Sequence, residues 1–147
     1  MSTVVKPVLV LVGISLLLAS CSRQAGPPRK ETFPVKGEVY VDGKPAGSLA
    51  VTCVDVKGMD AKQPTNSTAM TGEDGKFEIS TYQKADGVPE GEYILTFEWG
   101  QLNLINMSYG GPDKLNGRYK ESKDSKHRFK VEKGKPTDLG KIELTTK

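Results

Sequence analysis

The amino-acid sequence predicts an all-β domain, a seven-stranded antiparallel β-sandwich, behind an export signal and a short tether. Two observations support this prediction. Short segments with apolar residues at every second position follow one another from residue 33 onward, and glycine-containing turns separate them. After the export signal, no long segment repeats its apolar residues with the 3.6-residue period of an amphipathic helix.

The alternation of residues defines each predicted strand. In segment 92–99, the side chains of Tyr93, Leu95 and Phe97 share one face, and Trp99 continues that series. In segment 33–41, valines at every second or fourth position share a face, and Asp42-Gly43 then forms a tight hairpin turn. The predicted strands are 33–41, 49–56, 68–71, 77–81, 92–99, 127–132 and 139–144.

The segment 100–126 interrupts this regular spacing. It is longer than a typical connection within a compact domain, and such insertions are often functional. Its first half carries apolar residues, which we expect to pack the loop over an open end of the sandwich. Pro112 and Gly117 bracket a short stretch in which we expect one helical turn.

Residues 1–20 predict a secretory signal peptide, because a charged start precedes a short apolar run and small residues. The end of this segment, Leu18-Ala19-Ser20-Cys21, resembles the lipobox of bacterial lipoproteins. That resemblance implies a mature chain that begins at a lipidated Cys21, with diacylglyceryl and fatty-acyl (palmitate) groups in the membrane. The alternatives are an ordinary signal peptide and an uncleaved membrane anchor, although for an anchor the apolar run is shorter than the roughly 20 residues that a bilayer span needs.

Residues 21–32 predict the lipidated N-terminus and a flexible linker, because they contain Gly26-Pro27-Pro28 and no large apolar side chain. Residues 33–147 then form one domain with the long loop 100–126. Removing a 20-residue signal from 147 residues leaves 127, which is enough for one domain and too few for two.

Three segments resemble carboxypeptidase regulatory-like domains and occur in that family's order. Segment 35–45 is similar to "V-x-G-x-V-x-x-D-G-K-P", segment 71–77 to "T-x-x-D-G-x-F", and segment 88–93 to "P-x-G-x-Y". Segment 113–119 is similar to one that small lipoproteins with this domain often carry. The resemblance implies a Greek-key sandwich of the transthyretin (prealbumin) type. These motifs are turn signals, so they indicate the fold and not the chemistry.

Composition and side-chain chemistry exclude several function classes. The precursor has a net charge of +3, and loss of Lys6 with the signal leaves 20 basic and 18 acidic residues, hence +2, which does not favour a nucleic-acid partner. The chain has one histidine, His127, whereas hydrolases and iron dioxygenases on related sandwiches use several. The loop carboxylates match no calcium-binding spacing. We therefore expect no cofactor, no metal and no enzymatic activity.

The lone thiol of the domain, Cys53, lies between apolar residues, and we expect it to be buried and inert. His127 stands in register with Phe129 and Val131 at the start of a strand, and we expect a structural or surface role for it. A hydrolase built on His127 is the weakest hypothesis, because the sequence offers no nucleophile or orienting partner for it.

The candidate binding residues are aromatic and basic residues in and next to the long loop. Trp99 is either exposed, where it could stack on a sugar or anchor a protein, or part of the core. Segment 113–135 has nine basic and four acidic residues, a patch that could attract anionic lipid or polysaccharide, or simply a solvated surface. The candidates are Trp99, Tyr109, Arg118 and Tyr119.

The resulting hypothesis is a non-enzymatic, lipid-anchored protein of the cell envelope. Its β-sandwich is expected to act as a structural or protein-interaction module, with a protein or an envelope polysaccharide as partner. The alternative is a carbohydrate- or small-ligand-binding module that uses Trp99 and loop 100–126. Ser22 follows Cys21 in place of the aspartate that retains some lipoproteins in the inner membrane, which favours the outer membrane.

Overall fold

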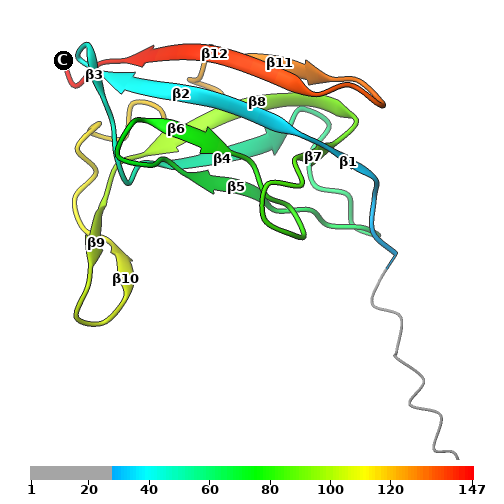
Figure 1. Ribbon diagram of the computed structural model, residues 1–147, viewed down its shortest axis with the longest axis horizontal. Coiled ribbons are helices and arrows are strands. Elements are labelled where there is room, and N and C mark those ends of the chain that lie inside the picture. Colours follow the sequence, from blue (N-terminus) through cyan, green and yellow to red (C-terminus); the bar gives the residue numbers. More distant parts are fainter. Residues whose placement is uncertain (1–27) are drawn as a thin grey trace, which may run out of the picture.

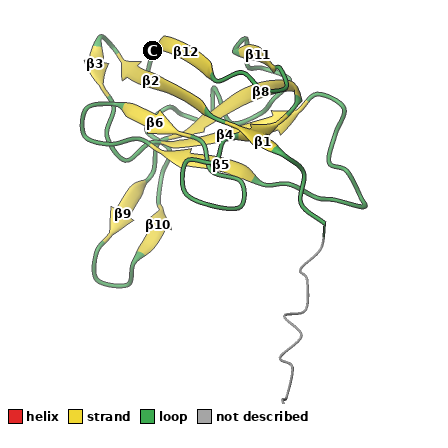
Figure 2. Cartoon of the chain, turned by 45° about the vertical axis from the view of Figure 1, so that its right-hand side comes forward, coloured by secondary structure: helices red, strands yellow, loops and turns green. Residues whose placement is uncertain are grey.

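The computed structural model of this protein describes residues 28–147, so the signal peptide and Cys21 lie outside the described residues. Within that range the chain is all-β and forms no helix (Figure 2). Accordingly, no described segment forms a helix that is long and apolar enough to cross a membrane. The strands gather into two four-stranded sheets and two small strand pairs, an arrangement consistent with a β-sandwich (Figure 1).

The first large sheet is antiparallel throughout and has the order β11-β8-β4-β5. Its central strand β8 pairs with β4, which places Phe97 opposite Val51 and Leu95 opposite Cys53. All four of these side chains are buried, so the alternation predicted for segment 92–99 is confirmed. The strands are β4 (Ala50–Asp55), β5 (Ser67–Met70), β8 (Gly91–Glu98) and β11 (Arg128–Val131).

The second large sheet is built around β2 (Val35–Val41). The predicted tight turn at Asp42-Gly43 is confirmed, with positive φ at both residues, 50° and 79°. It joins β2 to β3 (Lys44–Pro45), a strand that the sequence did not predict. The strand β6 (Lys76–Glu78) pairs antiparallel with the first half of β2, on the same edge as β3. On the other edge lies β12 (Thr137–Leu144), which runs parallel to β2.

The parallel pair corrects the prediction of a purely antiparallel sandwich. The chain enters β12 directly after β11, which belongs to the other sheet, and turns through Gly134 at φ 75°. A strand that arrives from the opposite sheet is not bound to run against its new neighbour, as the second strand of a hairpin is. Alternation within a segment reports which side is buried and says nothing about the direction of the pairing partner.

Five further strands were missed by the sequence pattern, so residues 28–147 contain twelve strands and not seven. Two of the additional pairs are short and separate from the large sheets. The strand β1 (Thr32–Phe33) pairs with β7 (Val88–Pro89), and β9 (Gln101–Asn103) pairs with β10 (Ser108–Gly110). Strands of two or three residues are too short to display a recognisable alternation.

The core lies between the two large sheets. It takes the valines of β2, Ile142 and Leu144 from one sheet and the inward residues of β4 and β8 from the other. Cys53 belongs to this core, and burial raises the pKa of its thiol to about 12. Burial and the raised pKa agree with the expectation of an unreactive thiol.

The segment 100–126 does not cover an open end of the sandwich as a whole. Its first part forms the β9–β10 hairpin, which projects away from the body of the molecule (Figure 1). Residues 112–117 form successive turns and no helix. Leu115 is the one apolar residue of these turns, and its side chain is fully buried in the core. Residues 111–126 therefore pack onto the sandwich, whereas the hairpin does not.

Candidate functional site

The candidate site is the end of β8 where the chain leaves the sandwich, together with the sheet surface next to it. Trp99 stands at this point and is partly buried against the core. Its indole Nε1–H donates a hydrogen bond to the carbonyl of Gly47 at 3.0 Å. The ammonium of Lys114 lies 4.6 Å from the centre of the ring. Hence Trp99 is neither a freely exposed stacking platform nor a fully buried core residue.

Asp113 fixes the return of the chain from the hairpin. Its carboxylate accepts hydrogen bonds from the backbone N–H groups of Trp99 at 2.9 Å, Leu115 at 3.0 Å and Gly117 at 2.9 Å. Burial acts to raise the pKa of Asp113, but these three donors outweigh it, and the net pKa is lowered. In the sequence, Asp113 was noted only as part of the segment 113–119 that resembles a family motif. An aspartate that precedes turn residues often accepts hydrogen bonds from their backbone, and this was the signal that could have identified its role.

Tyr109 fixes the base of the hairpin from the other side. Its hydroxyl accepts a hydrogen bond from the N–H of Gly100 at 2.7 Å and lies 2.9 Å from the carbonyl of Glu98 and 3.1 Å from that of Ser48. Burial raises the pKa of the Tyr109 hydroxyl. A Cβ on Gly100 would lie 2.9 Å from the carbonyl oxygen of Gly110, so the two strands approach closely here.

Tyr119 lies over the core near Phe97 and His127. Its ring meets the ring of Phe97 edge to face at 6.3 Å, and its hydroxyl accepts a hydrogen bond from the N–H of Thr145 at 3.1 Å. The backbone N–H of Phe97 donates to the Tyr119 carbonyl at 2.9 Å. Arg118, the neighbouring candidate, is exposed. The structure thus gathers Trp99 and Tyr109 at the hairpin base and places Tyr119 and Arg118 in the packed return segment.

The surface next to the hairpin is the outward side of the β11-β8-β4-β5 sheet. We call the middle of this surface the outer face, and it consists of Ala50, Thr52, Val54, Thr68, Ile94 and Thr96. The strand register places Glu92, Glu98, Arg128 and Lys130 on the same side, at its margins. Thr52 stands directly opposite both Thr68 and Thr96. A depression of about 310 Å³ lies at its end, bordered by Tyr109, Glu98 and Lys120. Lys120 and Glu98 form an ion pair at 3.4 Å on this border.

The sequence pattern missed most of this face. Alternation predicted that Ile94 and Thr96 point away from the core, and they do, yet both are nearly inaccessible to solvent. Side chains of the neighbouring strands shield them from solvent. These neighbours are distant in the sequence, so the shielding depends on how the strands pair. The signal present in the sequence was the low charge of the outward positions of 50–54.

A second, larger depression lies where β6 meets β2, next to the end of β5. Its volume is about 590 Å³, and its border includes Lys36, Glu38, Lys76 and Asp138. Lys36 pairs with Asp138 at 3.3 Å. Both signs of charge mix along an open border, so this depression has no field that would select one kind of ligand.

His127 lies half-buried beside Phe97, whose ring it meets edge to face at 5.4 Å. Burial lowers the pKa of the imidazole. Cys53, buried in the core, is the other group of nucleophilic or basic character that the sequence raised. Among the described residues, no group of three or more histidine, cysteine, aspartate or glutamate side chains is placed to hold a metal ion.

Two of the loop carboxylates considered as calcium ligands, Asp42 and Asp86, accept hydrogen bonds from other parts of the chain. Asp42 accepts hydrogen bonds from the N–H and hydroxyl of Thr146, and these bonds lower the pKa of its carboxyl. Asp86 accepts bonds from the N–H groups of Thr81, Tyr82 and Gln83. The contacts of Asp86 are those of a turn-capping carboxylate, whereas Asp42 ties the turn after β2 to the C-terminal segment.

Comparison with known proteins gives only distant likenesses. No family model matches the sequence, and no curated protein matches it. A 9R-lipoxygenase from Cyanothece is similar over 82% of this chain and 17% of its own, with 15% identity and a TM-score of 0.39. A DUF3823 family protein from Parabacteroides merdae is similar over 79% of this chain and 46% of its own, with 12% identity and a TM-score of 0.38. The chain therefore spans less than half the length of either protein.

These comparisons correct one expectation. The prediction that the chain is not an enzyme does not stand, because one of the similar structures belongs to an enzyme, the lipoxygenase. A likeness at this TM-score and over 17% of that enzyme establishes neither an enzymatic nor a non-enzymatic role. The label of a carboxypeptidase regulatory-like domain receives no support from a family model, and what the structure shows is a β-rich domain.

Proposed function

We propose that the protein is a lipid-anchored component of the cell envelope, held in the membrane through Cys21, whose β-sandwich is a structural or protein-interaction module. In this proposal the domain is a Greek-key sandwich of the carboxypeptidase regulatory-like, transthyretin-related type. The lipobox-like Leu18-Ala19-Ser20-Cys21 supports the anchor, and the ordered motifs of segments 35–45, 71–77 and 88–93 support the domain type.

The main support for an interaction module is that the polar side chains of the candidate site are already hydrogen-bonded within the protein. The indole N–H of Trp99, the hydroxyl of Tyr109 and the carboxylate of Asp113 all bond to backbone groups at the hairpin base. These side chains hold a shape and leave few polar atoms to address a small molecule. Beside them lies the outer face, whose middle is uncharged and whose margins carry charged residues such as Glu98 and Arg128, an arrangement suited to contact with another protein.

The first test addresses the anchor. Cys21→Ser should transfer the full chain from the detergent phase to the aqueous phase, because the acylated thiol is the attachment point. A matched control is Cys53→Ser, which keeps Cys21 and should stay in the detergent phase. Retention of the Cys21→Ser chain in the detergent phase would contradict the lipid anchor.

The second test addresses the outer face. Thr52→Arg places a charge at the centre of this face, where it should abolish capture of a protein partner from native envelope extract. Lys76→Arg, on the opposite sheet, is the control and should capture normally. Capture that persists after protease treatment of the extract would indicate a polysaccharide or lipid partner and contradict the protein-interaction module.

The carbohydrate-binding alternative depends on Trp99, the single tryptophan of the chain. Its ring is engaged by Lys114 and Gly47, so we expect tryptophan fluorescence that acrylamide quenches only partly. Addition of envelope oligosaccharides should leave it unchanged. A sugar-induced shift of the emission maximum would favour this alternative over the protein-interaction module.

A further inference from the structure

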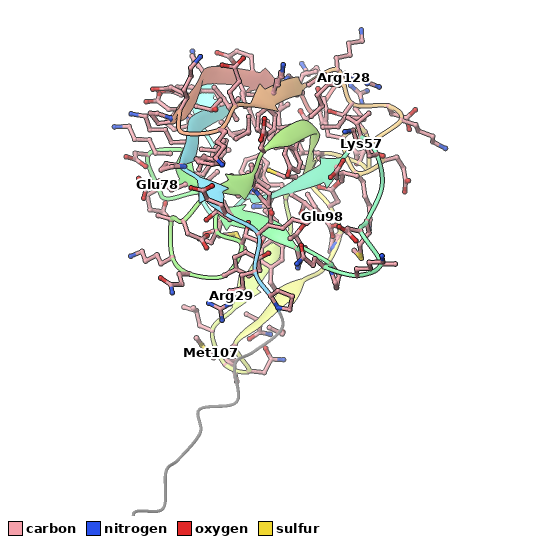
Figure 3. The ribbon with its side chains drawn as sticks, turned by 90° about the vertical axis from the view of Figure 1, so that its right-hand side faces the viewer. Arg29, Lys57, Glu78, Glu98, Met107 and Arg128 are labelled. Carbon is pink, nitrogen blue, oxygen red and sulfur yellow. The ribbon has the colours of Figure 1, made fainter. Side chains whose placement is uncertain are left out.

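The tip of the β9–β10 hairpin exposes three large apolar side chains. We call these three residues the hairpin tip: Leu104 is 73% exposed, Ile105 is 97% exposed and Met107 is 75% exposed. They stand on a hairpin that projects from the body of the molecule, with Met107 at its far end (Figure 3). Exposure of such side chains to water is unfavourable, and exposed apolar patches usually mark a surface that binds another molecule or a membrane.

The hairpin also lacks charge. No Asp, Glu, Lys or Arg occurs from Gly100 through Pro112, in a chain that is 27% charged. Met59 makes a useful contrast, because it is 74% exposed but stands among the charged residues Lys57, Asp60 and Lys62. Burial of a charged loop carries a large desolvation cost, and burial of the hairpin tip does not.

Three donor groups at and next to the tip are already paired within the hairpin. The amide oxygen of Asn103 accepts a hydrogen bond from the N–H of Ile105 at 3.0 Å. The amide oxygen of Asn106 accepts bonds from the hydroxyl of Ser108 at 2.7 Å and from its N–H at 3.2 Å. Backbone groups that leave water must find partners elsewhere, and these N–H groups have them in place.

The position of the hairpin indicates what it meets. The described chain begins below the body of the sandwich, the direction in which the hairpin also projects, and the two lie at opposite ends of the long axis (Figures 1 and 2). In Figure 3, Arg29 and Met107 lie toward one end of the molecule, and Arg128 lies at the other. Seven residue-to-residue steps lead from Cys21 to Pro28, and they span at most about 25 Å.

We propose that the hairpin tip inserts into the interfacial region of the bilayer that holds the lipid on Cys21. This inference rests on the proposed lipid anchor and adds a second contact of the domain with the same membrane. The short tether keeps the domain near the lipid surface, which raises the effective concentration of the tip there. Two contacts then fix the orientation of the sandwich, with the β11 side directed away from the membrane.

The test measures the depth of single labelled positions in the lipidated full chain. Ile105→Cys receives an environment-sensitive fluorophore, and Arg128→Cys on β11 is the matched control. The buried Cys53, with its pKa raised to about 12, does not compete for the label. The protein is reconstituted into phosphatidylcholine vesicles, and mass spectrometry of the acylated N-terminal peptide verifies the anchor first.

Interfacial side chains lie about 5–10 Å within the headgroup and acyl boundary, so a lipid-borne spin label should quench position 105 about threefold more than position 128. The emission at position 105 should also shift to the blue. The double substitution Leu104→Ser and Met107→Ser in the Ile105→Cys chain should return the label to water without releasing the acylated chain from the vesicles.

Each other outcome overturns the inference in an identifiable way. Equal, water-like emission at both positions in a chain with verified acylation would overturn membrane insertion and leave the anchor proposal intact. Protection of position 105 that appears only on addition of envelope proteins would show that the tip binds a protein and not lipid. If Cys21 carries no lipid, the anchor proposal fails by mass spectrometry alone, before the hairpin is tested.

Discussion

The two halves of the long connection between β8 and β11 differ in how they meet the sandwich. Residues 111–126 are fastened by Asp113, by the buried side chain of Leu115 and by the hydroxyl of Ser125, which donates to the carbonyl of Leu95. The β9–β10 hairpin is fastened only at its base, through Tyr109. A single connection between two strands can therefore stabilise the fold with one half and expose apolar side chains with the other.

The largest expected effect lies in the fastened half. Leu115→Ala removes a fully buried side chain and should lower the free energy of unfolding by about 2–5 kcal/mol. The matched substitution in the projecting half, Ile105→Ala, should change it by less than about 0.5 kcal/mol. Urea unfolding of both variants checks the comparison. Equal effects would mean that the two halves are not energetically distinct.

The next effect concerns the carboxylate that holds the return segment. Asp113→Ala leaves the N–H groups of Trp99, Leu115 and Gly117 without their acceptor and should lower the free energy of unfolding by about 2 kcal/mol.

The same residue predicts an acid dependence. Because the pKa of Asp113 is lowered in the folded state, its contribution is complete above the ordinary value of 3.8 and is lost as the pH falls through the lowered value. The Asp113→Ala chain should therefore lose less stability on acidification below pH 4 than the parent does. A parallel decline of both chains in acid urea titrations would contradict this role.

A smaller effect is expected from His127, which lies beside the return segment at Tyr119. Burial lowers its pKa below the ordinary 6.5, so the unfolded chain binds a proton first as the pH falls. Stability is complete above pH 6.5 and should decline below it, by less than about 1 kcal/mol for a half-buried group. His127→Phe keeps a ring against Phe97 and should remove this part of the decline in thermal unfolding measured from pH 7 to pH 5.

The smallest effect on stability should come from the hairpin tip. The triple substitution Leu104→Ser, Ile105→Ser and Met107→Ser changes three exposed side chains and should move the free energy of unfolding by no more than about 0.5 kcal/mol. Chemical unfolding in the absence of membranes is the measurement. A loss of several kcal/mol would show that the tip packs against the sandwich in solution.

The fold could be predicted where its cause is local. The alternation around Tyr93, Leu95 and Phe97 identified the core side of β8, and Asp42-Gly43 identified a hairpin turn, because both signals lie within a few residues. The parallel pairing of β12 with β2 could not be predicted, since it joins Thr137 to Val35 through the arrangement of both sheets. Nothing in either segment records the direction of its partner.

For the candidate site, too, the sequence predicted the local features and missed those that depend on distant residues. Trp99 and Tyr109 were selected from the sequence as aromatic residues at the loop, and the structure places both at the hairpin base. Their hydrogen bonds to Gly47 and Glu98 could not be foreseen, because those carbonyls become neighbours only through folding. The exposure of Ile105 was hidden for a related reason: an apolar residue in a loop sequence suggests packing, and only the hairpin geometry shows where it points.

The parallel pairing of β12 with β2 also affects the order in which the domain can fold. During synthesis β2 is made early and β12 late, so an emerging chain carries β2 with one edge unpaired until residues 137–144 are available. Closing such a distant pair is slow compared with forming a hairpin. In the export that we propose for this chain, a sheet that is completed late would keep the domain unfolded for longer, the state in which a chain passes through a translocation channel.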